Sequence, residues 1–110
     1  MAALNEIKEY LDRLLDLESF SGDHSNNGLQ VEGRAEVGRI LFSVDSSMEL
    51  FELAARKKAD MIFAHHGLSW GGSFKRLTGL TARRLGSLFK SGVSLYAAHL
   101  PLDAHPKLGN

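Results

Sequence analysis

Two adjacent histidines and a third one farther along the chain are the side chains best suited to chemistry in this sequence. His65 and His66 directly follow the apolar run Met61–Ala64, and His99 precedes Asp103 by four residues. Imidazole nitrogens are common ligands of zinc, iron and related divalent ions, and a nearby carboxylate completes a mixed nitrogen and oxygen coordination set. The residue types and their spacing therefore predict part of a metal site.

Other residues near these segments have both structural and functional interpretations. His24 and His105 are interpreted as hydrogen-bonded structural residues, whereas Asp45 either caps a helix or hydrogen-bonds to a metal ligand. Trp70 and Phe74, in a glycine-bearing loop, form either a small lid or an oligomer contact. A solvated helix face, rather than a phosphate clamp, is expected for four basic residues: Lys75, Arg76, Arg83 and Arg84.

The segments that must position these residues alternate between strand and helix. Near-continuous apolar runs predict strands buried on both faces, and leucine spacing predicts helices between them. The predicted strands are Arg39–Asp45, Asp60–His66 and Val93–His99. The first intervening helix is expected to begin at Ser46–Glu49, which resembles a capping box, and to run to about Lys58. The second is expected around Leu80–Phe89 and to end at Gly92 in a left-handed conformation.

The first third of the chain has a different pattern. Apolar residues at helical spacing predict an amphipathic helix from Leu4 to about Leu17. The polar segment Ser21–Gly33 is expected to be a loop that holds a short strand at Leu29–Val31. Together with the alternation that follows, this predicts an α/β fold with a parallel-stranded central sheet and flanking helices, built from right-handed βαβ units.

The predicted sheet explains why distant polar residues would meet. Parallel strands end at one edge of a sheet, where ligands collect, so Asp45, the histidine pair and His99 are expected there together. Adjacent residues of a regular strand point to opposite faces, so His65 and His66 share one ion only if the strand twists into a loop. Alternatively, each binds its own ion of a two-metal cluster. Asp103 fits a ligand delivered by a loop.

Composition limits the possible functions. The 110 residues fit one small domain, residues 1–110, and 13 basic residues balance 13 acidic ones, which gives no field to gather nucleic acid. The chain has no cysteine, so a metal must be held by His, Asp, Glu or Asn. No apolar run approaches the roughly 20 residues that cross a bilayer. A cytoplasmic protein without membrane contact is expected.

Four motifs, taken in order, carry a resemblance to a known family. They are Asn27–Val31, Ile40–Asp45, Ala64–Leu68 and Tyr96–Asp103, the last leading to Gly109–Asn110. With these motifs the chain resembles the N-terminal half of the NIF-three-like dinuclear metal centre family, whose members are called GTP cyclohydrolase I type 2 homologues. The sequence departs from the family's Trp-Asp-Asn pattern, since Ser25–Asn27 stands in its place.

The resemblance implies a metal site and an assembly. It implies that His65, His66 and Asp103 bind metal, with His99 either a further ligand or beside the ligands. It also implies two divalent ions, which zinc, iron or manganese would suit, and a homo-oligomeric ring, commonly a hexamer. Family members are about twice this long and take a further His and Glu from their C-terminal half. The chain is therefore expected to be the N-terminal part of a longer protein, or a short relative.

Three functional hypotheses follow from these residues. The first is a metal-dependent hydrolase in which activated water attacks a purine nucleotide, as the name GTP cyclohydrolase suggests, or a phosphoester. The second is a metal-binding, ring-forming assembly or interaction protein without catalysis. The third treats the histidines only as hydrogen-bonded strand ends. No phosphate-binding loop or base pocket is recognisable in the sequence, so the nucleotide substrate rests on the resemblance alone.

Overall fold

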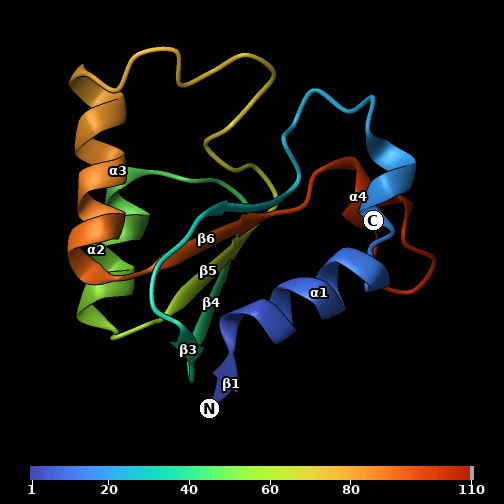
Figure 1. Cartoon of the computed structure of the whole chain (residues 1–110), viewed down its shortest axis with the longest axis horizontal. Coiled ribbons are helices and arrows are strands. Elements are labelled where there is room, and N and C mark those ends of the chain that lie inside the picture. The colour runs from blue at the N-terminus through green and yellow to red at the C-terminus, as the bar shows by residue number, and fades with distance from the viewer. Residues whose placement is uncertain (110) are drawn as a thin grey trace.

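The computed structural model describes residues 1–109, so Asn110, the last residue of the motifs above, lies outside the described residues. A four-stranded sheet forms the centre, and helices lie on both of its faces (Figure 1). The sheet contains β2 (Gly28–Val31), β4 (Ile40–Ser43), β5 (Met61–Ala64) and β6 (Ser94–Ala97), and a separate ribbon contains β1 (Ala2–Ala3) and β3 (Glu36–Val37). The helices are α1 (Leu4–Leu14), α2 (Met48–Arg56), α3 (Gly79–Ser91) and α4 (Leu100–Ala104), with a short 3-10 helix at Leu17–Phe20.

Three of the four strands of the central sheet run parallel, as predicted. The strand order is β2-β6-β5-β4, and β4, β5 and β6 pair in parallel so that Ser43, Ala64 and Ala97 lie at the same level. The residues that follow these three positions therefore share one edge of the sheet. The short strand β2 pairs antiparallel with β6, a direction that its pattern did not specify, because no crossover helix leads into it.

Two apolar layers account for the near-continuous apolar strands. Side chains of α2 and α3 pack against one face of the sheet, and α1 packs against the other. Along β5, Met61 faces the layer with α1 and Ile62 faces the layer with α2 and α3. In β6, Tyr96 faces the layer with α1, and Leu95 faces the layer with α2 and α3. Both strands are thus buried on both faces, as the sequence predicted.

Several predicted boundaries shift in the structure. The first helix ends at Leu14 rather than Leu17, because Asp16 adopts a left-handed conformation with φ of 50°. The cap of α2 lies one residue later than the predicted capping box, because the Oγ of Ser47, not of Ser46, accepts the hydrogen bond from Leu50 N, at 3.1 Å. The hydroxyl of Ser46 instead donates to a backbone carbonyl. The left-handed C-terminal glycine of α3, Gly92, is confirmed with φ of 69°.

The strands and the basic residues also differ from the prediction. The three predicted strands from Arg39 onward are each shortened to four residues, whereas the predicted strand Leu29–Val31 begins one residue earlier, at Gly28. The segment after β6 is a short helix, α4, rather than a loop. Lys75 and Arg76 lie in the loop before α3, not on a helix face, whereas Arg83 and Arg84 are on α3. Of the helices in residues 1–109, none has the length and apolar character needed to cross a membrane.

Candidate metal centre

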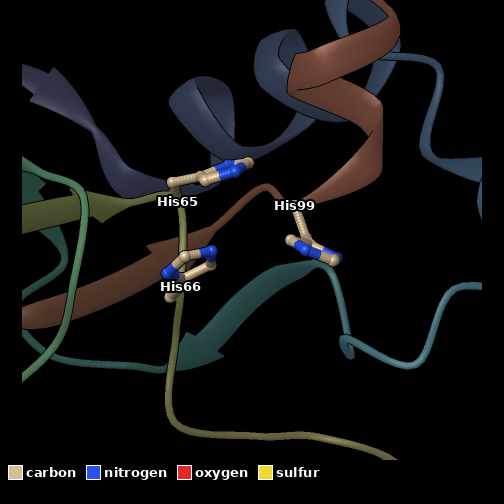
Figure 2. A group of neighbouring side chains, drawn as sticks. All are labelled: His65, His66 and His99. Atoms are coloured by element: carbon tan, nitrogen blue, oxygen red, sulfur yellow. The ribbon is translucent and has the colours of Figure 1, made fainter.

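The three histidine rings gather where β5 and β6 end (Figure 2). The ring centres of His65 and His66 are 4.6 Å apart, and that of His99 lies 5.3 Å from the first and 5.6 Å from the second. One nitrogen from each ring lies within 4.8 Å of the other two. The edge of the sheet thus collects the three histidines that the sequence singled out.

The local backbone explains how two adjacent histidines face the same space. The strand β5 ends at Ala64, and the chain bends at His65 and His66. The backbone N–H groups of both histidines still donate to β4 and its extension, at 3.1 Å to Ser43 O and 2.7 Å to Val44 O. The bend removes the strict alternation of a strand, so the condition for a shared ion is met.

Hydrogen bonds orient the rings of the histidine pair. Nδ1 of His65 lies 2.8 Å from Ala98 O, and Nδ1 of His66 lies 2.7 Å from the carboxylate of Asp45. A carbonyl or carboxylate oxygen can only accept, so each Nδ1 carries the proton and each Nε2 of the neutral ring keeps its lone pair. This is the arrangement in which histidine binds metal through Nε2.

The third ring is oriented by a carboxylate that the sequence analysis missed. Nδ1 of His99 lies 3.0 Å from Oδ1 of Asp23. The Asp23 carboxylate also accepts hydrogen bonds from the side chain of Asn27 and from the backbone N–H groups of Ser25 and Leu100. Burial raises the pKa of Asp23, but these hydrogen bonds outweigh it and hold the pKa well below its usual range. An aspartate two residues before a serine in a polar loop looks like an ordinary turn residue, which is why sequence reasoning passed over it.

Two predicted carboxylates lie beside the cluster. Asp45 does not cap α2, which is capped by Ser47; it hydrogen-bonds to His66, the second of its two predicted interpretations. Asp103 lies on α4 rather than on a loop, and its Oδ1 is 3.6 Å from Nε2 of His65. A carboxylate oxygen is therefore available next to the free nitrogen of His65. Imidazole nitrogens with one carboxylate are a donor set that fits zinc, iron or manganese.

Trp70 forms a wall of the cluster. Its ring meets that of His99 edge-on at 5.1 Å and stacks with that of His24 at 6.2 Å. Its loop is tied to the preceding polar loop by backbone hydrogen bonds, from Gly71 N to His24 O and from Asn26 N to Ser69 O. The tryptophan is thus held in place by main-chain bonds on both sides.

The remaining predicted residues lie away from the cluster. Phe74 packs against the layer of α2 and α3. The structural interpretation of His105 is confirmed, because its Nδ1 accepts hydrogen bonds from the backbone N–H groups of Lys107 and Leu108. The ring of His24 stacks on Trp70 and is not one of the three rings of the cluster.

A pocket opens beside the first histidine. It has a volume of about 520 Å³, and its wall includes His65 together with Phe42, Phe63 and Leu102. This volume falls within the range of pockets that bind small molecules. The pocket thus brings apolar side chains against His65, the histidine of the cluster that lines it.

The fold and the site define an α/β protein with a three-histidine candidate metal centre at the carboxyl edge of a mostly parallel sheet. The sequence model of the DUF34/NIF3 family, described as NGG1p interacting factor 3, matches residues 2–110. The chain belongs to this family, which confirms the resemblance that the motifs predicted.

Several relatives of this chain carry one shared name. A protein of Archaeoglobus fulgidus named GTP cyclohydrolase 1 type 2 homolog is 51% identical over 107 residues, which are 97% of this chain and 43% of the relative. A protein of the same name from Pyrococcus horikoshii is 48% identical over 106 residues, covering 96% of this chain and 42% of the relative. The chain thus spans less than half the length of these relatives.

Solved structures give the same picture. The crystal structure of TTHA1606 from Thermus thermophilus superposes with a TM-score of 0.94 at 44% identity and covers 98% of this chain and 44% of that protein. The structure of reduced HcgD from Methanocaldococcus jannaschii gives a TM-score of 0.79 at 26% identity, over 93% of this chain and 41% of that protein. The predicted α/β architecture is therefore shared by solved members of the family.

Proposed function

We propose that this chain binds divalent metal ions through His65, His66, Asp103 and His99. The observation that supports the proposal is the orientation of the three rings. The Nδ1 of each ring lies against a hydrogen-bond acceptor. Among the described residues, the shortest contact of an Nε2 with a backbone or carboxylate oxygen is the 3.6 Å between His65 and Asp103. Histidines that serve only as strand ends need no such convergence. Zinc, iron or manganese would suit the donor set, and two ions would use the neighbouring rings separately.

The chemistry that would follow is metal-dependent hydrolysis of a purine nucleotide or a phosphoester. Bound divalent ions would supply Lewis acidity and lower the pKa of water. The chain itself contributes the ligand histidines, the acceptors that hold their protons on Nδ1, and the apolar pocket beside His65 that would receive the substrate. The relatives named GTP cyclohydrolase 1 type 2 homolog make a guanine nucleotide the first substrate to try.

A second candidate function is a metal-binding assembly without catalysis. It is favoured by the number of donors that gather in the described residues: three imidazole rings and the nearby carboxylate of Asp103 are few ligands for two ions. Metal would then stabilise a homo-oligomer, which the family resemblance makes a hexameric ring, in the cytoplasm. Light scattering with and without zinc tests this assembly.

The decisive experiment measures bound metal by elemental analysis after purification without chelator. We expect close to stoichiometric metal in the wild-type chain and loss of nearly all of it in the double variant His65→Ala, His66→Ala. His105→Ala is the matched control, because this histidine bonds only to nearby backbone in the structure. Metal absent from the wild type, or kept by the double variant, would contradict the proposal.

Turnover separates the two candidate functions. The metal-loaded protein is incubated with a panel of guanine nucleotides and phosphoesters, and products are separated chromatographically. Turnover that disappears in the double variant supports the hydrolase. Stoichiometric metal with metal-dependent oligomerisation and no turnover supports the assembly protein instead.

A further inference from the structure

The carboxylate behind His99 distinguishes this ring from its two neighbours. His65 is held by a neutral backbone carbonyl, and His66 by Asp45, whose side chain is 79% exposed. The side chain of Asp23 is only 2% exposed. A buried carboxylate acts on the ring with little screening by solvent, so its effect on the position of the ring proton is the strongest of the three.

The same polar loop holds both the ring and the backbone of His99. The two carboxylate oxygens of Asp23 lie 3.0 and 3.3 Å from Nδ1 of the ring. The backbone N–H of His99 donates to Oδ1 of Asn27 at 2.8 Å, and that of Leu100 donates to Asp23 at 3.0 Å. Asn27 in turn donates to Asp23 at 3.0 Å, which closes the network. The network leaves the ring little freedom to rotate or to change partners.

We propose that Asp23 is a positioning residue of the candidate metal centre: its carboxylate keeps the proton of the His99 ring on Nδ1 and presents Nε2 to the other histidines. The consequence for metal binding rests on the proposed function, whereas the tautomer can be measured in the metal-free protein. A purely structural aspartate, needed only for the polar loop, would leave the tautomer and the metal affinity unchanged once folding is accounted for. Outer partners of ligand histidines tune affinity by about 10–100-fold.

The experiment combines a spectroscopic and a binding measurement. Two-bond proton–nitrogen spectra of nitrogen-15-labelled, metal-free protein report which ring nitrogen of His99 carries the proton. Calorimetric titration with Co²⁺ then compares the wild type with Asp23→Asn and with Asp60→Asn. Asp60 is the matched control, because it is a hydrogen-bonded carboxylate with a 14% exposed side chain at the opposite edge of the sheet. In the described residues Asp60 contacts no histidine.

We expect a proton on Nδ1 in the wild type, a rise of the other tautomer in Asp23→Asn, and Co²⁺ affinity about 10–100-fold lower in that variant only. A wild-type proton on Nε2, an unchanged tautomer in Asp23→Asn, or an equal loss of affinity in Asp60→Asn would overturn the proposal. If Asp23→Asn does not fold, the wild-type spectrum decides. If Co²⁺ binds to none of the proteins, the proposed function fails, while the spectra still decide the role of Asp23.

Discussion

Two carboxylates at opposite edges of the sheet use the same physical device for different ends. Asp60, directly before β5, accepts hydrogen bonds from Gly38 N, Arg39 N and the guanidinium of Arg34. Asp23, beyond the other end of the strands, also accepts several hydrogen bonds, but one of them comes from a histidine ring. Both carboxylates have a pKa below the usual range. At the edge where the parallel strands begin, the amino edge, the carboxylate thus fixes only the backbone and a surface arginine. At the carboxyl edge it also fixes a candidate metal ligand.

The difference shows how a fold can support a site at little extra structural cost. Each carboxylate accepts hydrogen bonds from two backbone N–H groups, those of Ser25 and Leu100 for Asp23 and those of Gly38 and Arg39 for Asp60. At the carboxyl edge the polar loop must be tied down in any case, and the acceptor that does this also faces the ring of His99. Asp23 therefore both stabilises the fold and positions the ring of His99, whereas Asp60 only stabilises the fold.

The largest expected effect is on stability at the carboxyl edge. Asp23→Ala removes the acceptor of four hydrogen-bond donors, three of them partly buried. Because partly buried donors are costly to leave without an acceptor, we expect the free energy of unfolding to fall by about 3 kcal/mol. Asp60→Ala is expected to cost less, about 1–2 kcal/mol, because the side chain of Arg34 is 53% exposed and can turn to water. Urea denaturation measures both; an equal or larger loss in Asp60→Ala would break the comparison.

A pair of glycine substitutions sharpens the comparison through packing. A Cβ at Gly67, next to the histidine pair, would overlap Oε1 of Gln30 and lie 2.5 Å from Cβ of Ala97. Gln30 cannot yield easily, because that oxygen accepts two backbone hydrogen bonds. We expect Gly67→Ala to cost about 2 kcal/mol. Thermal unfolding measures the change.

The control for this substitution lies at the amino edge. A Cβ at Gly38 meets only the flexible side chain of Met1 at 3.2 Å and Asp60 at 3.6 Å. Gly38→Ala is expected to change stability by no more than about 0.5 kcal/mol. If both substitutions had the same effect, the carboxyl edge would not be the more tightly built of the two.

The smallest expected effect is the pH dependence contributed by Asp60. The hydrogen bond from Gly38 N is the main cause that lowers its pKa, burial opposes it, and Arg39 and Arg34 lower it further. Because the pKa of Asp60 is lower in the folded state, its ionised carboxylate stabilises the protein above about pH 4. This stabilisation is lost as the pH falls through the folded-state pKa. Asp60→Asn should therefore lose less stability than the wild type on acidification. A steeper loss in the variant, measured by urea denaturation across that range, contradicts this assignment.

Much of the fold could be read from local patterns. The apolar run Met61–Ala64 predicted a strand buried on both faces, and Gly92 predicted a helix end. The histidine pair followed directly from its place after the strand. The direction of β2 and the cap of α2 could not be predicted in this way, because each depends on a distant partner. The strand β2 takes its direction from pairing with β6. The hydroxyl of Ser46 donates to the carbonyl of His66, and the neighbouring Ser47 caps the helix.

The sequence by itself determined that polar, metal-competent side chains follow the apolar strands, since strand periodicity and residue type are local properties. Only the tertiary structure decided which nitrogen of each ring points into the cluster. That choice depends on acceptors such as Asp23, which lies 76 residues from His99 along the chain and meets it only when the sheet has formed. A hydrogen bond between distant residues leaves no local pattern in the sequence, so its partner is found only in the folded molecule.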